Sequence, residues 1–240
     1  MLLIHRFAVP LLPQEKAMGV GSAGRTRIPQ VGILPVFGRI LYCFYAAFGG
    51  GREIMMRKNF GAKAYCYPQP VFILAAYGED GKANAMNAAW GGISEENELS
   101  MCISAGHKTT KDILARGAFT VSMADADHVA ACDYVGLVSG NSEKNKLERA
   151  GFHTVKSEFV DAPLIEELPV ALECRLKSYD PESCRMVGEI VNVSVDERVL
   201  TDGKVDVKKA KPITFDPFNN AYVVLGDTVG AAFHDGKALK

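Results

Sequence analysis

The 240-residue sequence lacks the short motifs by which many enzymes bind or transform their substrates. It contains no G-x-S-x-G elbow, no phosphate-binding P-loop, no H-E-x-x-H and no G-x-G-x-x-G after a strand. Its five histidines lie far apart, and no pair has the spacing of metal ligands on a helix. We therefore predict no metal site, and we assign no catalytic residue.

Excess charge, paired cysteines and long apolar runs are also scarce. The formal net charge is -1, which gives no general attraction to nucleic acid or anionic membranes, so neither is expected as a partner. The six cysteines include no C-x-x-C pair, which argues against a disulfide framework and for a reduced, cytoplasmic protein. The apolar run from Val31 to Gly51 is interrupted by Pro35 and Arg39, so it is a poor transmembrane helix.

The first 55 residues differ in composition from the remainder. They hold several Lys and Arg but no Asp. The segment from Gly49 to Met56 reads "GGGREIMM", whose Gly, Arg and Glu are residues that purine-rich codons encode. A ribosome-binding site read in frame would give such residues. We therefore expect residues 1–55 to be an N-terminal extension outside the functional domain, with translation starting at Met55 or Met56, and a single domain over 56–240.

Beyond Met56 the sequence predicts a mainly β domain with inserted helices. The run Val71–Tyr77 and the segment Asn84–Trp90 flank the turn "GEDGK" and predict a hairpin. Further strands are expected at 99–105, 118–123, 171–179, 185–200 and 221–226, and helices at 109–117, 125–140 and 142–151. Because helices and strands do not alternate regularly, we expect an antiparallel barrel rather than a doubly wound sheet.

Two stretches could carry chemistry. "KANAMNAAWGG", from Lys82 to Gly92, combines small residues, amides and the only tryptophan, so a planar ligand could lie against its main chain. "SAGHKTTKD", from Ser104 to Asp112, is a strand-to-helix junction with hydroxyls and cations, which suits a phosphate monoester. Tight barrel packing around Trp90 and a plain threonine helix cap are the alternatives.

In the order of its segments, the chain from Met56 onward resembles the flavoredoxin branch of the flavin reductase-like family. "NAMNAAW", "HKTTKDIL", "DYVGLVSGNSEKNKLERAGF", "DAPLIEELPVALECRL" and "VGEIVNVSVDERVL" carry the resemblance. It implies a Greek-key-like, antiparallel FMN-binding split β-barrel, usually a homodimer with the flavin close to the interface.

The resemblance also implies which residues bind the cofactor. The isoalloxazine ring is expected at Asn84, Met86, Asn87, Ala88, Ala89 and Trp90. The phosphate is expected at Ser104, His107, Lys108, Thr109 and Thr110, and Lys146 matches a family lysine near the flavin.

The function implied is an oxidoreductase in which FMN takes a hydride from NAD(P)H and passes electrons to a small-molecule or protein acceptor. One alternative is a flavoredoxin-type electron carrier with tightly bound FMN and no nicotinamide site. Another is a flavin-free barrel with an interaction role.

Overall fold

The computed structural model describes residues 56–240. The extension predicted for residues 1–55, and with it a start at Met55, lies outside the described residues. The chain divides into two compact units, Met1–Lys63 and Ala64–Lys240. Residues 56–63 contain no helix or strand, so the described secondary structure belongs to the second unit.

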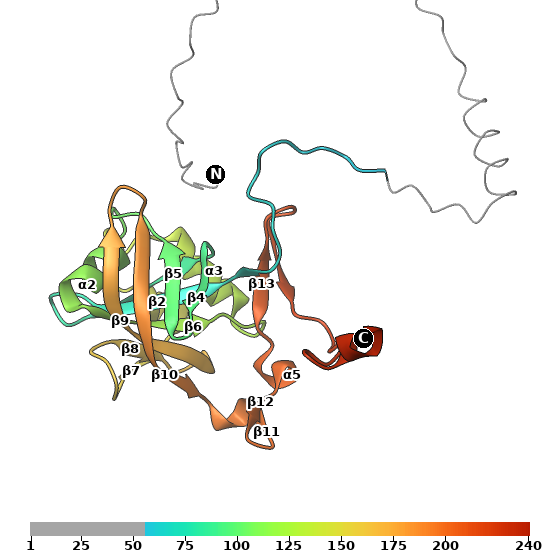
Figure 1. Ribbon diagram of the computed structural model, residues 1–240. Coiled ribbons are helices and arrows are strands. Elements are labelled where there is room, and N and C mark those ends of the chain that lie inside the picture. Colours follow the sequence, from blue (N-terminus) through green and yellow to red (C-terminus); the bar gives the residue numbers. More distant parts are fainter. Residues whose placement is uncertain (1–55) are drawn as a thin grey trace, which may run out of the picture. The chain divides into compact units, whose positions relative to one another are not determined.

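A seven-stranded antiparallel sheet forms the centre of this unit (Figure 1), in the order β3-β2-β6-β9-β10-β5-β4. The strands are β2 (Phe72–Tyr77), β3 (Ala83–Ala88), β4 (Gly91–Glu95), β5 (Glu98–Cys102), β6 (Ala118–Met123), β9 (Val170–Asp180) and β10 (Arg185–Val195). The predicted hairpin is confirmed, because β2 and β3 pair antiparallel from Phe72 opposite Ala88 to Tyr77 opposite Ala83.

The sheet curls because its two edge strands are almost continuous in the chain. β3 and β4 lie at opposite edges of the sheet, yet only Ala89 and Trp90 join them. Such a short link brings the two edges together at one corner, as in a barrel that is split along one side. The mainly β, antiparallel split-barrel fold is therefore confirmed.

Two apolar cores cover the two faces of the strands. Leu74, Phe119 and Met186 are among the residues that fill the barrel interior. Ile73, Ala85 and Val135 are among those that pack between the outer face of the sheet and the helices. Because β2 is covered on both faces, its run FILAAY is buried at five of six positions instead of alternating.

Three helices cover the sheet near β3. They are α2 (Lys108–Arg116), which contacts β2, β3 and β6, and α3 (Val129–Leu137) and α4 (Lys146–Ala150), which contact β3 and each other. The helix expected at 109–117 is thus confirmed to within one residue at each end. The region predicted as helix at 125–140 is helical only from Val129, because the Asp125 carboxylate accepts hydrogen bonds from the N–H groups of Asp127 and His128 and forms a turn.

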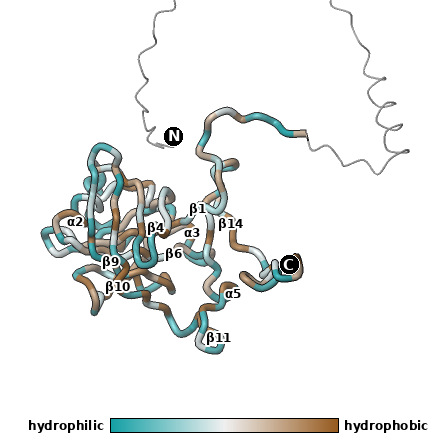
Figure 2. Tube along the Cα trace, viewed as in Figure 1, coloured by the Kyte–Doolittle hydropathy of each residue, from teal (hydrophilic) through white to brown (hydrophobic). Residues whose placement is uncertain are grey.

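The remaining elements are short. A second sheet has the order β1-β13-β14, and two hairpins are formed by β7 with β8 and by β11 with β12. These elements, with the last short helices, are β1 (Gln69–Pro70), β7 (Thr154–Lys156), β8 (Pro163–Ile165), η1 (Glu197–Val199), β11 (Leu200–Thr201), β12 (Lys204–Val205), α5 (Val207–Ala210), β13 (Ile213–Asp216), β14 (Ala221–Val224) and η2 (Asp235–Leu239). Figure 2 shows hydrophilic residues at the turn between β9 and β10 and at the β11–β12 hairpin. Among the described helices, none has the length and apolar character needed to cross a bilayer.

Candidate functional site

The site expected on β3 is divided between the two faces of that strand. Side chains alternate along a strand, so Asn84, Met86 and Ala88 face the barrel interior, while Ala85 and Asn87 face the helices. Met86 and Ala88 pack in the barrel core. Ala85 belongs to the core under α3. The two asparagines of this segment therefore have different surroundings.

Asn84 is buried between β3 and α2. Its Nδ2 donates to Thr109 Oγ1 at 2.8 Å and lies 3.4 Å from Asp112 Oδ2. Gly140, in the loop after α3, packs against the same amide so closely that a Cβ there would lie 3.0 Å from Asn84 Cγ. Asn84 is thus held in one orientation by a helix on one side and a loop on the other.

Asn87 is held against α3 instead. Its Nδ2 donates to the backbone carbonyl of Cys132 at 3.1 Å. A Cβ built at Gly136 would lie 2.9 Å from Asn87 Cβ, so the strand and the helix approach closely here. The structure therefore places the amide of Asn87 in helix packing, on the face of β3 opposite Asn84.

The strand-to-helix junction is a tight turn that leads into α2. Thr110 Oγ1 donates to the Ser104 carbonyl at 2.8 Å, and Ser104 Oγ accepts a hydrogen bond from the Gly106 N–H at 3.3 Å. The N-cap residue His107 provides no side-chain cap, and the first turn of α2 contains no acidic side chain. The N–H groups of the first turn have no intrahelical acceptors, so their partial positive charge is directed out of the helix end.

Lys108 does not point toward that helix end. Its Nζ lies 2.7 Å and 3.0 Å from the two carboxylate oxygens of Asp112, one turn further along α2. A Cβ built at Gly78 would lie 2.9 Å from this Nζ, so the β2–β3 turn also packs against it. Asp112 therefore links Lys108 to Asn84. The i,i+4 spacing of Lys108 and Asp112 is the signal in the sequence that predicts this contact.

Lys146 is a buried cation at the first position of α4. It is 3% exposed, and its Nζ donates to the carbonyls of Val135 at 3.2 Å and Val138 at 3.0 Å, at the C-terminal end of α3. Burial lowers the pKa of Lys146 to about 8, and the negative charge of Asp112 partly opposes that effect. The Lys146 ammonium is therefore held at the C-terminal end of α3 and is attracted to Asp112 of α2.

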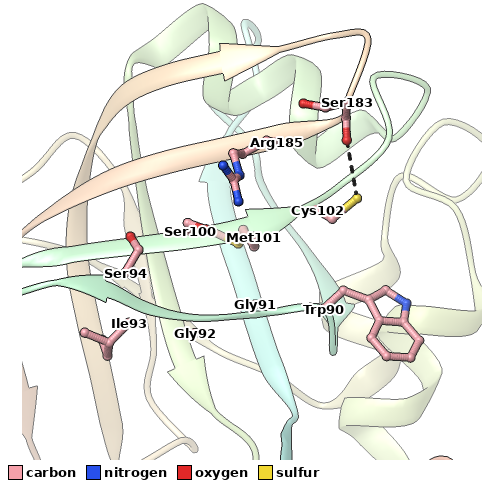
Figure 3. Close-up of a pocket in the computed structure, with 10 residues that line it drawn as sticks. All are labelled: Trp90, Gly91, Gly92, Ile93, Ser94, Ser100, Met101, Cys102, Ser183 and Arg185. Atoms are coloured by element: carbon pink, nitrogen blue, oxygen red, sulfur yellow. Dashed lines mark hydrogen bonds between the residues drawn. The ribbon is translucent and has the colours of Figure 1, made fainter. Parts of the chain in front are cut away.

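Trp90 lies where the chain crosses from β3 to β4, next to Ala89. Its side chain is 40% exposed, and its carbonyl accepts a hydrogen bond from the Cys102 N–H at 2.8 Å. It lines an open hollow of about 510 Å³ on β4, β5 and β10, which we call the Trp90–Arg185 hollow (Figure 3). The lining residues are Trp90, Gly91, Gly92, Ile93, Ser94, Ser100, Met101, Cys102, Ser183 and Arg185.

Some of the predicted residues form two groups. Asn84, Lys108 and Thr109 meet around Asp112, and Trp90 lines the hollow on β4, β5 and β10. Met86 and Ala88 belong to the barrel core, and Asn87 belongs to the contact with α3. Asp112, Gly140 and Arg185 join these groups, although the sequence pattern did not single them out. Within residues 56–240 no cluster of His, Cys, Asp and Glu is arranged to hold a metal ion.

The chain matches known proteins over most of this unit. The sequence model of the family described as "Flavin reductase like domain" matches residues 64–211. The structure of the flavoredoxin of Desulfovibrio vulgaris (Miyazaki F) has 35% identical residues and a TM-score of 0.72, covering 75% of this chain and 100% of that chain.

Two further relatives agree with this match. The flavoredoxin from Methanosarcina acetivorans has 31% identity and a TM-score of 0.70, and the match covers 78% of this chain and 100% of that one. An uncharacterised protein of Halalkalibacterium halodurans is 25% identical over 162 residues, which is 61% of this chain and 77% of the relative.

Proposed function

The chain belongs to the flavin reductase-like domain family, and on that basis we propose that it is an FMN-binding oxidoreductase that accepts a hydride from NADH or NADPH. FMN supplies the redox chemistry of such a site, because its ring accepts a hydride and releases electrons. The protein supplies binding, orientation and electrostatics. The electrons then pass to a small-molecule or protein acceptor.

The observation that carries this proposal is the uncapped N-terminal turn of α2. A chain that caps this helix end with its own carboxylate would compete with an external anion, but the first turn has no acidic side chain and His107 gives no side-chain cap. The Asn141 amide donates to the Gly106 carbonyl at 3.2 Å and fixes the loop after α3 beside this turn. These groups fit a phosphate monoester, with the α2 N–H groups as donors and Lys146 as the nearby cation.

The ring of the cofactor is assigned to the segment from Ala88 to Trp90. Ala88 is buried in the barrel core, but the small side chain of the partly exposed Ala89 leaves the main chain beside it accessible to a flat ligand, and the 40%-exposed Trp90 offers an aromatic face. Backbone N–H groups in this segment would stabilise negative charge on the reduced ring. Asn84 has an indirect role in this proposal. Its amide holds Thr109 and Asp112 in the N-terminal half of α2, where the phosphate is assigned.

A second candidate function is electron transfer without a nicotinamide site. The flavoredoxin of Desulfovibrio vulgaris (Miyazaki F), at 35% identity, favours it. In that case a protein partner would reduce the bound FMN. The two candidates share the cofactor site and differ only in the electron donor.

We also propose that the functional form is a homodimer. Ile93 on β4 is 64% exposed beside Trp90, next to the segment assigned to the flavin ring. The family resemblance implies a dimer interface close to the flavin, and a second copy there would cover this apolar side chain. Light scattering coupled to size exclusion tests this: a dimer mass supports it, and a monomer mass at micromolar concentration contradicts it.

FMN titration tests the cofactor assignment directly. Trp90 is the only tryptophan of the chain, so intrinsic indole fluorescence reports on this one position. We expect FMN to quench it at one equivalent per chain, and riboflavin, which lacks the phosphate, to bind at least about tenfold more weakly. A protein that neither quenches nor retains FMN on gel filtration contradicts the proposal. Equal affinity for FMN and riboflavin contradicts the phosphate site.

A further inference from the structure

The Trp90–Arg185 hollow has one positively charged side chain and no acidic residue in its lining. Figure 3 shows Arg185 projecting from β10 toward β5, with Trp90 at the end of the β4 segment. Within residues 56–240 the Arg185 side chain makes no hydrogen bond and no ion pair. Burial, with a smaller contribution from Cys184, raises the pKa of the Cys102 thiol, so no thiolate offsets the guanidinium at neutral pH.

The nearest carboxylate along the ladder does not neutralise Arg185. Asp180 lies directly opposite Arg185 in the β9–β10 pairing. Its carboxylate instead accepts hydrogen bonds from the Ser183 hydroxyl and from the Glu182 N–H. Arg185 thus remains available to an external anion, and an unpaired guanidinium is well suited to bind a carboxylate or phosphate through two parallel hydrogen bonds.

Backbone atoms form the floor of the hollow, because Gly91 and Gly92 have no side chains to cover it. The two glycines have different roles. A Cβ at Gly91 would lie 2.8 Å from Met101 Cβ, so a glycine is required where β4 and β5 approach. A Cβ at Gly92 would meet no atom within 4 Å, so it would project into open space. The missing side chain of Gly92 therefore leaves a flat peptide surface beside Trp90, on which an aromatic ring can lie.

We propose that the Trp90–Arg185 hollow binds a planar aromatic ring that carries a carboxylate or phosphate group, with Arg185 pairing with the anion. The ring lies over Gly92 beside Trp90, and Ser94, Ser100 and Ser183 supply hydroxyls at the rim. A hollow of about 510 Å³ suits one ring with its anionic group. This inference rests on the proposed function, because it names the substrate class that exchanges electrons with the flavin at Trp90. An aromatic acid acceptor carries ring and anion together, whereas the ring of a nicotinamide nucleotide bears an uncharged carboxamide and is separated from its phosphates by ribose, so we assign the hollow to the acceptor.

Calorimetric titration of the FMN-loaded protein with benzoate and with benzamide tests the charge requirement. The two probes have the same ring and nearly the same shape, and they differ in charge. We expect benzoate to bind at least about tenfold more tightly than benzamide. Arg185→Gln should abolish this preference, and Arg185→Lys should retain part of it. Arg175→Gln removes an exposed guanidinium of β9 outside the hollow and should leave it unchanged.

Gly92→Leu tests the location independently of charge. A leucine side chain there fills open space rather than the core, so the fold should be retained while both probes are excluded. Equal binding of benzoate and benzamide to the unaltered protein, or an unchanged preference in Arg185→Gln, overturns the inference. Either result with FMN still bound leaves the proposed function intact, whereas failure of FMN to bind overturns the proposed function itself.

Competition with NADH tests whether the hollow belongs to the nicotinamide nucleotide instead. Displacement of benzoate by NADH would assign the hollow to that nucleotide and overturn the aromatic acid as its ligand. Reduction of FMN by NADH while benzoate stays bound supports an aromatic acid acceptor.

Discussion

Asn84 Nδ2 donates a hydrogen bond to Thr109 Oγ1 at 2.8 Å, and this contact ties the edge strand β3 to the first turn of α2. It joins the segment assigned to the flavin ring to the helix end assigned to the phosphate. Both groups are almost fully buried, with Asn84 7% exposed and Thr109 1% exposed. A substitution of Asn84 on β3 can therefore shift Thr109 and change phosphate binding at the first turn of α2.

Asn84→Ala should weaken both folding and FMN binding. It leaves the buried Thr109 hydroxyl without its donor, while Asp112 keeps its contacts with Lys108, and the loss costs about 1–3 kcal/mol of unfolding free energy. We expect FMN affinity to fall by about tenfold, a change of about 1.4 kcal/mol. Urea unfolding and FMN titration measure the two effects.

Asn87→Ala is the matched control for Asn84→Ala. It removes the same side chain from the same strand, but on the face that packs against Cys132 of α3. We expect a comparable loss of stability with little change in FMN affinity. If Asn87→Ala weakened FMN binding as much as Asn84→Ala, the division of β3 into two faces would not explain the site.

Lys146 should make stability depend on alkaline pH. Its pKa is lowered from 10.5 to about 8 in the folded protein, so between pH 8 and 10.5 the unfolded chain binds the additional proton. The contribution of Lys146 to the unfolding free energy therefore rises with pH across this window, by up to about 3 kcal/mol. The buried thiols of Cys132 and Cys174, whose pKa values are raised from 9.0 to about 12, act in the opposite sense above pH 9. Urea unfolding at pH 7 and pH 10 should therefore give a more positive change in unfolding free energy for the unaltered protein than for Lys146→Met. The exposed Lys144→Met should behave as the unaltered protein does, and a pH dependence unchanged in Lys146→Met contradicts the assignment.

FMN affinity should fall above pH 8 for the same reason. An anionic phosphate favours the protonated ammonium, so binding is linked to proton uptake once the free Lys146 has lost its proton. We expect the dissociation constant to rise by at most about tenfold per pH unit above pH 8. Titrations of the Lys146→Met variant should show a flat profile over this range. A flat profile in the unaltered protein places Lys146 away from the phosphate.

Gly140→Ala should disturb the site without altering any polar group. A Cβ at this position overlaps the Asn84 side chain, so the amide or the loop must move, at a cost of about 1–3 kcal/mol. We expect lower stability and weaker FMN binding, measured together by thermal unfolding with and without FMN. Gly226→Ala, where a Cβ meets nothing within 4 Å, is the control and should have no effect on either.

Thr110→Val should separate phosphate binding from ring binding. The substitution preserves shape but removes the hydroxyl that donates to the Ser104 carbonyl, so the turn before α2 loses a fixed contact. We expect FMN affinity to fall about tenfold while riboflavin affinity changes little. An equal loss for both ligands would show that the junction does not act on the phosphate.

Local patterns in the sequence predict six of the seven strands of the central sheet but miss most of the short strands outside it. The β-former run at 71–77 and the clean alternation at 171–179 correspond to β2 and β9. β4 was missed, because Gly91 and Gly92 have low strand propensity and are stabilised there by pairing with β5. The order of strands in the sheet depends on contacts between distant segments, so residue patterns alone do not determine it. The family resemblance implied the split barrel but not this order.

The sequence placed the candidate residues on one strand and at the start of one helix, but it did not predict the directions of their side chains. The period of two along β3 separates Asn84 from Asn87, so the sequence already indicated that both could not face one ligand. The direction of the Lys108 side chain depends on its contact with Asp112 and on the close packing of Gly78. The packing of Gly78 is visible only in the three-dimensional structure. Arg185 lies far from Trp90 in the chain, and the pairing of β10 with β5 brings the two into one hollow.

Anaerobic mixing of the FMN-loaded full chain with NADH or NADPH tests the central claim most directly. The account predicts that the flavin's visible absorbance is lost on addition of either nucleotide, at a rate that far exceeds that of free FMN. Bound FMN that keeps its absorbance with both nucleotides would contradict a nicotinamide-dependent reductase and favour an electron carrier reduced by a protein partner.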